Sequence, residues 1–129
     1  MSAAEKIREM IDANLRNMRQ LDVVRFIDQL LPVVAEVGGI KCSLSSHQRL
    51  RFQFPDQQPF EVDLERAKPT LRCMCARLAV LTQEITGRDF NPYGDEGAFE
   101  FPFGTNQKGN WKIQVKNTPD KQEFALDLE

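Results

Sequence analysis

The sequence lacks several features that would point directly to a function. No stretch approaches the roughly 18 uninterrupted apolar residues of a membrane-spanning helix. The first ten residues carry charges where a secretory signal would have an apolar core. The 129 residues include one histidine and three cysteines, and this odd number in a chain large enough for its own core favours free thiols over a disulfide framework. We therefore expect a cytoplasmic protein with no membrane contact and no structural metal.

The chain also lacks an excess of positive charge. Seventeen lysines and arginines face nineteen aspartates and glutamates, for a formal net charge of −2, so no global field attracts it to a phosphate backbone. Its glycines match none of the spacings that bind nucleotides. We expect no nucleic-acid partner and no cofactor. With 41% hydrophobic residues, the composition is that of a single packed domain over residues 1–129.

Residues 1–37 show helical periodicity. A narrow apolar stripe occupies the first half, and a broad apolar face continues through the second half to Gly38-Gly39. We predict one continuous helix with a kink at Pro32, which ends at the two glycines. An alternative interpretation makes the sequence around these glycines a β-hairpin, because a Gly-Gly pair is also a hairpin signal.

The rest of the chain combines two strand regions with a second helix. Residues 40–65 and 97–129 alternate apolar and polar side chains, which predicts two three-strand meanders. Between them, residues 69–87 have helical spacing, with Pro69 at the start and Gly87 as a C-terminal stop. The order predicts an α+β domain in which helices cover one face of a mainly antiparallel sheet whose other face is polar.

The N-terminal stripe is the main candidate for a binding surface. Its residues follow the alternating three- and four-residue steps of a coiled-coil seam, with one polar member that would set the register. The stripe comprises Ile7, Ile11, Asn14, Met18 and Leu21, preceded by Ala4. Two interpretations stay open: the stripe packs on a partner chain, or it docks along the sheet of its own domain.

The segment RDFNPYGDEGAFE, residues 88–100, resembles a calcium-binding loop in its spacing. Counted from Asp89, oxygen-bearing side chains and a glycine occupy most of the required positions; the candidate ligands are Asp89, Asn91, Asp95, Glu96 and Glu100. However, alternating phenylalanines predict a strand where the motif requires a helix. The sequence from Asn91 to Gly94 is also typical of a type I turn.

Three further groups of residues are candidate sites. Arg66, Lys68 and Arg72 surround the start of the second helix, where an anion would find free backbone N–H groups. His47 follows two serines, the raw material of nucleophilic catalysis, but a polar loop is the simpler interpretation. The three thiols are expected to be buried and inert. We assign no catalytic residue.

These patterns favour binding over catalysis. The expected order of elements is similar to that of small acidic secretion chaperones, which act as dimers, although this chain lacks their closing C-terminal helix. We predict a non-enzymatic protein-interaction module, adaptor or chaperone-like, that forms a homodimer through the N-terminal helix and the aromatic-rich C-terminal meander. The alternative is a small-ligand, anion or calcium-binding domain, with or without enzymatic activity, whose site lies in the loop 89–97.

Overall fold

Helices and groups of strands alternate along the chain. The computed structural model describes residues 2–15, 23–45 and 47–129. Its elements are α1 (Ala3–Leu15), α2 (Val23–Glu36), β1 (Lys41–Leu44), β2 (Arg49–Gln53), β3 (Phe60–Asp63), the 3-10 helix η2 (Glu65–Thr70), α3 (Leu71–Thr86), β4 (Gly94–Phe103), β5 (Gln107–Thr118) and β6 (Lys121–Leu128). The two predicted strand regions and the helix between them are therefore present.

The six strands form one antiparallel sheet in the order β3-β2-β1-β6-β5-β4. Each meander occupies one half of the sheet, and β1 and β6 join the halves at its centre. In this central pair Cys42 lies opposite Leu126 and Leu44 opposite Phe124. The first and last strands of the chain are thus neighbours, and a single sheet results.

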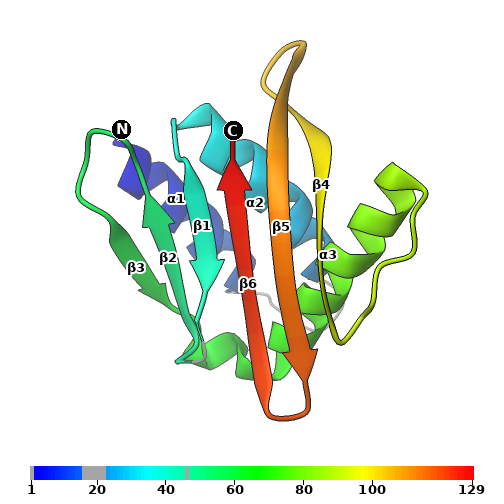
Figure 1. Ribbon diagram of the computed structural model, residues 1–129. Coiled ribbons are helices and arrows are strands. Elements are labelled where there is room, and N and C mark those ends of the chain that lie inside the picture. Colours follow the sequence, from blue (N-terminus) through cyan, green and yellow to red (C-terminus); the bar gives the residue numbers. More distant parts are fainter. Residues whose placement is uncertain (1, 16–22, 46) are drawn as a thin grey trace.

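The helices lie together on one face of the sheet (Figure 1). Helix α3 packs on β4, β5 and β6, and α2 packs between α1 and α3. At the opposite edge, the Arg8 guanidinium of α1 lies 5.2 Å from the centre of the Phe60 ring on β3, a cation–π contact. The α+β prediction, with helices on an antiparallel sheet, is confirmed.

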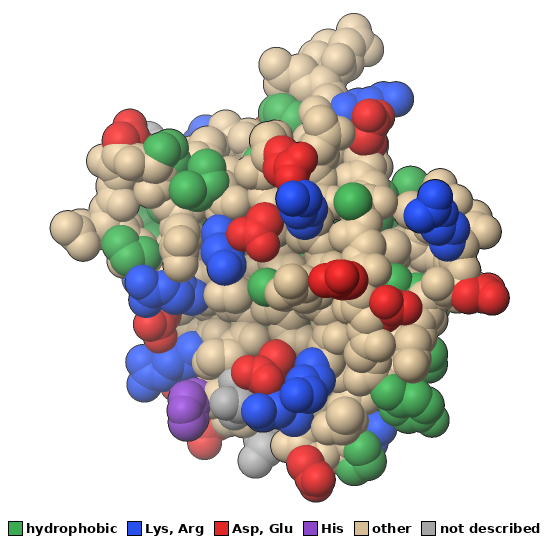
Figure 2. Space-filling model, in the orientation of Figure 1, with side chains coloured by type: hydrophobic (Ala, Val, Ile, Leu, Met, Phe, Trp, Pro, Cys, Tyr) green, Lys and Arg blue, Asp and Glu red, His purple; other side chains and the backbone are tan. Residues whose placement is uncertain are grey.

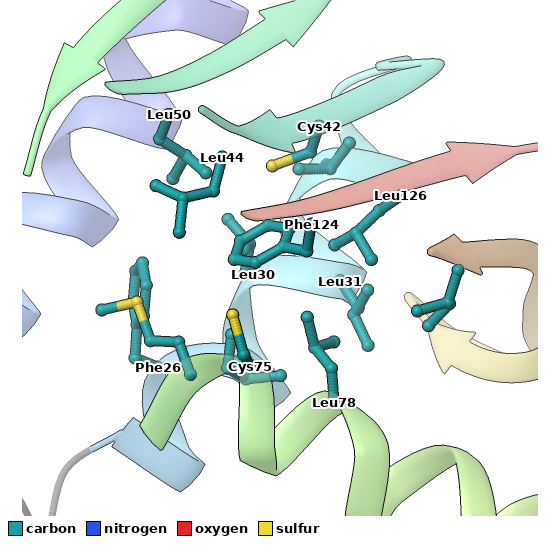
Figure 3. Close-up of a cluster of buried hydrophobic side chains, with 14 of the residues drawn as sticks. Phe26, Leu30, Leu31, Cys42, Leu44, Leu50, Cys75, Leu78, Phe124 and Leu126 are labelled. Atoms are coloured by element: carbon teal, nitrogen blue, oxygen red, sulfur yellow. The ribbon is translucent and has the colours of Figure 1, made fainter. Parts of the chain in front are cut away.

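The core fills the space between the helices and the sheet (Figure 3). Strand side chains alternate in burial, as along β5, where every second residue from Gly109 to Asn117 is buried. The cluster in Figure 3 combines α2, α3, β1, β2 and β6 through Phe26, Leu30, Leu31, Cys42, Leu44, Leu50, Cys75, Leu78, Phe124 and Leu126. Alternation therefore leaves the other sheet face to solvent.

The N-terminal region differs from the prediction of one continuous helix. It forms two helices that pack against each other, and Asn14 Nδ2 of α1 donates to Gln29 Oε1 of α2 at 2.9 Å. On one straight helix these residues would lie roughly 22 Å apart along the axis, at about 1.5 Å per residue. The continuous helix is wrong, because stacking two amphipathic helices buries more apolar surface than one extended rod.

The two predicted helix ends are close to those observed. Helix α2 contains Pro32 and gives way to Gly38, which has a positive φ of 81°, so the helical interpretation is confirmed over the hairpin. Pro69 lies inside η2, and α3 begins two residues later and ends at Gly87 in a left-handed cap. No helix in the described ranges is long and apolar enough to cross a membrane.

Burial of the stripe on α1 predicts the effect of truncating Ile11, which is fully buried within its own chain. Ile11→Ala should lower the free energy of unfolding by about 2–5 kcal/mol, measured by urea denaturation. Because the contacts are intramolecular, the loss should not change with protein concentration. Ile85→Ala is the matched control: Ile85 is 43% exposed and should cost less than about 0.5 kcal/mol. A concentration-dependent loss at Ile11 would place it against a partner chain.

Candidate functional site

The apolar stripe of α1 is not an open surface. Ile7 and Ile11 are fully buried, and Asn14 is 3% exposed. The Asn14 amide donates to Met10 O at 2.8 Å and to Gln29 Oε1 at 2.9 Å. The structure thus places these three residues in the core of their own domain, as in the second of the two interpretations, and the assignment of them to a partner surface is corrected. Met18 and Leu21 lie outside the described residues.

The aromatic side chains of the C-terminal meander are also turned toward the helices. Phe99 is 6% exposed, Trp111 1% and Phe124 3%, so they contribute packing and are not available as a contact surface. Tyr93, in the turn before β4, is 64% exposed.

Residues 88–100 form a turn followed by a strand, and the predicted calcium loop is absent. Gly94 N–H donates to Asn91 O at 3.2 Å, and the Asn91 side chain accepts from Tyr93 N–H at 3.0 Å. Glu100 lies on β4 opposite Asn110, its carboxylate 4.0 Å from Lys108 Nζ. Within the described ranges, no group of three histidine, cysteine, aspartate or glutamate side chains is arranged to hold a metal. The turn and strand that the sequence also indicated are therefore observed in place of a helix-loop-helix motif.

Asp95 has a structural role in this turn. Its Oδ2 accepts from Asn91 N–H at 2.9 Å and its Oδ1 from Glu96 N–H at 2.8 Å. These two backbone hydrogen bonds, the one from Asn91 first, lower the pKa of the exposed Asp95 carboxyl, because they stabilise its charged form. This carboxylate, one of the candidate ligands, instead fixes the start of β4.

A cavity of about 420 Å³ lies between the edge of β4 and the C-terminal half of α3. Its walls are the polar face of α3, the segment after that helix and the first half of β4: Thr82, Thr86, Arg88, Asp89, Phe90, Asp95, Glu96, Gly97 and Ala98. Gly97 brings the strand close to the helix, since a Cβ there would lie 3.0 Å from Thr82 Cγ2. The volume is within the range of about 300–1,000 Å³ typical of ligand pockets.

Strand β4 is an edge strand, and alternate residues direct their backbone groups away from the sheet. Asn117 N–H of β5 donates to Tyr93 O, and Glu129 N–H donates to Asn110 O. These two bonds show that the backbone groups of odd-numbered residues of β5 point toward β4. The odd-numbered residues of β4 therefore form hydrogen bonds with β5, and the backbone N–H and C=O groups of the even-numbered residues point away from the sheet. Pro102, which has no N–H, occupies an outward position, as expected on an edge.

The open face of the sheet carries both signs of charge in alternation (Figure 2). Arg51 Nη1 lies 3.2 Å from Glu61 Oε1 on the neighbouring strand, and Lys112 Nζ lies 2.8 Å from Glu129 Oε1. The hydrogen bond and charge of Glu129 raise the pKa of Lys112. Since both groups of each pair are exposed, solvent screens them and each adds little stability. This face offers no field of one sign.

Apolar side chains are exposed on the outer side of the helices. We define the helical patch as Val24 of α2 with Cys73, Ala76 and Val80 of α3; Val24 is 49% exposed and Val80 48%. Together with Val23 and Arg77 they line a shallow hollow of about 270 Å³ between the two helices. In the sequence, nothing distinguishes these exposed positions from core positions on the same apolar face. The one-sided packing of α2 and α3 cannot cover its full width.

The three thiols divide into two classes. Burial raises the pKa of Cys42 far above its ordinary value, and burial, followed by the charge of Glu123, raises the pKa of Cys75 to about 12. Cys73 is exposed, contrary to the expectation for all three. Residues two apart on a helix point in nearly opposite directions, so burying Cys75 turns Cys73 to solvent.

The other predicted sites show simpler structures. His47 is exposed in the β1–β2 connection, where its backbone N–H donates to Ser45 Oγ at 3.4 Å. Arg66 and Arg72 are exposed, and the Lys68 side chain lies outside the described part of the chain. Because η2 runs directly into α3, the segment 65–72 lacks the open helix end that the predicted anion site requires.

Comparison with known proteins adds no family: no protein-family model matches the chain, and no curated protein matches it in sequence.

The hydrogen bonds of Asp95 predict a pH-dependent contribution to stability. A carboxyl whose pKa is lowered in the folded state stabilises the fold above its unfolded pKa, and this contribution is lost as the pH falls through the folded pKa. Asp95→Asn should therefore unfold at a lower temperature than the natural chain at pH 7. The difference should shrink as both are acidified below about pH 4. Asp89→Asn is the control; an equal effect there would contradict a specific role for Asp95.

The turn geometry also predicts the response to calcium. The unfolding midpoint in EDTA should equal that in millimolar calcium, because a strand follows the turn where the motif needs a helix and the Glu100 carboxylate lies on this strand, 4.0 Å from Lys108 Nζ. A ligand present at 100 times its dissociation constant would add about 2.7 kcal/mol. A calcium-specific rise that disappears in Asp89→Asn would restore the calcium loop.

Proposed function

We propose that the protein is a non-catalytic protein-interaction module, adaptor or chaperone-like, that acts as a homodimer through the helical patch. One observation carries the proposal: four apolar or weakly polar side chains from two helices meet around a hollow on the outer side of the molecule, where water would otherwise cover them. Contiguous exposed apolar surface is costly and marks contact sites on many proteins.

The spacing on α3 suits a contact between helices. Cys73, Ala76 and Val80 are separated by three and four residues, so they form one stripe along the helix. Small side chains at Cys73 and Ala76 leave room beside the bulkier Val80. In a symmetric dimer, the same patch serves both subunits, and Val80 of each would enter the hollow between α2 and α3 of the other.

Neighbouring polar groups would form the rim of this contact. Arg77 lines the hollow and is held by Asp28 of α2, with Arg77 Nη2 3.1 Å from both carboxylate oxygens and Nε 3.3 Å from Oδ1. This bidentate pair fixes α2 against α3. The relative position of Val24 and Val80 is therefore set before a partner arrives, which lowers the entropic cost of binding.

The test is the oligomeric state of Val80→Glu. Sedimentation velocity over a hundredfold range of concentration should show a dimer for the natural chain and a monomer for the variant, because the new charge would be buried in a contact where Arg77 is already paired with Asp28. Ile85→Glu is the matched control, since Ile85 lies on the same helix, is similarly exposed at 43% and lies outside the hollow. A natural chain that remains monomeric, or a dimer that survives Val80→Glu, would refute self-association through this patch.

A second candidate function is ligand binding beside β4. The observation that favours it is the position of the 420 Å³ cavity, which coincides with the loop 89–97 where the sequence suggested a ligand site. The two functions use different surfaces, and the same chain can have both.

A further inference from the structure

We propose that the cavity between the edge of β4 and α3 binds an extended, basic segment of another polypeptide, which adds to the sheet as a further strand. The proposal names the partner chemistry of the interaction module described above and rests on that function, but not on self-association. Two features lie side by side here. The backbone groups of Glu96, Ala98 and Glu100 point outward from the edge of β4, and the cavity next to them is walled by α3 and carries carboxylates.

The backbone of β4 offers hydrogen bonds over a limited length. Gly94 N–H is already bonded to Asn91 O, and Glu96 N–H to Asp95 Oδ1. Among the described residues, no group bonds the outward N–H and C=O of Ala98 or of Glu100. From Glu96 to Glu100 the edge spans roughly 13 Å, at about 3.3 Å per residue. An incoming strand would pair with these groups, as in β-augmentation.

The cavity provides a second wall for such a strand. Ala98, Gly97 and Glu96 line it from the sheet, and Thr82 and Thr86 line it from α3. Both hydroxyls donate to backbone carbonyls of their own helix, Thr82 Oγ1 to Leu78 O and Thr86 Oγ1 to Thr82 O, each at 2.7 Å. Thr82 is 3% exposed and its methyl group lies beside Gly97, so the exposed Thr86 offers the helix wall on which an apolar side chain of the added strand can pack.

Charge around the edge favours a basic segment. Asp89, Asp95 and Glu96 line the cavity with one cation, Arg88. Glu100 follows on the same edge, where the exposed Lys108 lies 4.0 Å away and only partly offsets its charge. Glu96 and Glu100 lie on the open face, because their strand neighbours Gly97, Phe99 and Phe101 face the helices. Residues of an added strand opposite Glu96 and Glu100 would share that face. An added strand with lysine or arginine at two positions four residues apart would place these cations opposite Glu96 and Glu100.

The same charges disfavour a second copy of this chain at the edge. The antiparallel pairing that uses all three outward residues is centred on Ala98, and it would place Glu96 of one copy opposite Glu100 of the other. Like charges directly opposite each other destabilise a sheet. The occupant is therefore a segment of opposite charge, and the dimer contact lies elsewhere.

The probe is the peptide acetyl-TKVTVKT-amide, which places lysines opposite Glu96 and Glu100 and valines toward α3. Titrated to millimolar concentration into the full chain, it should shift the backbone N–H resonances of Ala98 and Glu100 and those of residues 86–90. N-acetyl-lysinamide is the control for a simple cation. No shift at Ala98 and Glu100, or equal shifts with the single amino acid, would overturn the proposal.

Two sets of variants separate backbone pairing from charge. Ala98→Pro removes an outward N–H without touching the β4–β5 ladder, and binding should weaken about tenfold or more, the equivalent of about 1.4 kcal/mol; Ala98→Thr keeps the N–H and should bind. Glu96→Lys with Glu100→Lys should reverse the preference, so that acetyl-TEVTVET-amide binds better. Thermal unfolding verifies that each variant is folded. Equal binding by Ala98→Pro and Ala98→Thr, or no reversal, would reject the added strand.

Peptide binding measured with the Val80→Glu variant distinguishes this inference from self-association. The variant should bind the lysine peptide as the natural chain does, whether or not it dimerises, because Val80 does not line the β4 cavity. Loss of binding in Val80→Glu alone would show that the groove depends on the dimer and would contradict the inference as stated.

Discussion

The pairing of β1 with β6 is the interaction on which the rest of the structure depends. It joins the first strand to the last, with Leu44 opposite Phe124 and Cys42 opposite Leu126. Without it the chain would contain two separate three-strand meanders, each too narrow to bury the helices. Contacts so distant in sequence are entropically expensive to form, and the buried side chains of this pair offset that cost. The six-strand width of the sheet follows directly.

Only one face of the sheet is covered by helices, and this determines which surfaces of the domain are left for contacts with other molecules. The α-helices of the described residues compete for this face, and α1 takes part of it by packing on α2. The outer sides of α2 and α3 then retain apolar residues that no element of the described chain covers, and the edge of β4 retains backbone groups that no strand pairs. The helical patch and the edge of β4 are therefore both left uncovered by the same packing arrangement.

Much of the fold could be predicted from periodicity, but the surfaces could not. Alternation along residues 40–65 and 97–129 indicated the strands, but the aromatic-rich meander was predicted as a contact surface, whereas Phe99 and Trp111 are buried. The separation into α1 and α2 was not predicted, because the apolar pattern of the sequence continues from one to the other without glycine or proline. The exposure of Val24 and Val80 was missed for a related reason: periodicity gives the width of an apolar face, whereas only the packing of neighbours decides how much of it is covered. The cavity beside Gly97 depends on the approach of β4 to α3, which local sequence does not encode.

The edge of β4 also bears on how the folded protein avoids aggregation. A ten-residue edge strand is long enough to recruit the edges of other molecules and to grow into a continuous sheet. Here the chain bonds the outward N–H of Gly94 and of Glu96 internally, and Pro102 has none to offer. Only Ala98 and Glu100 remain as donors, flanked by carboxylates. The edge is therefore long enough to accept one short segment in a fixed register and too short to template a fibril.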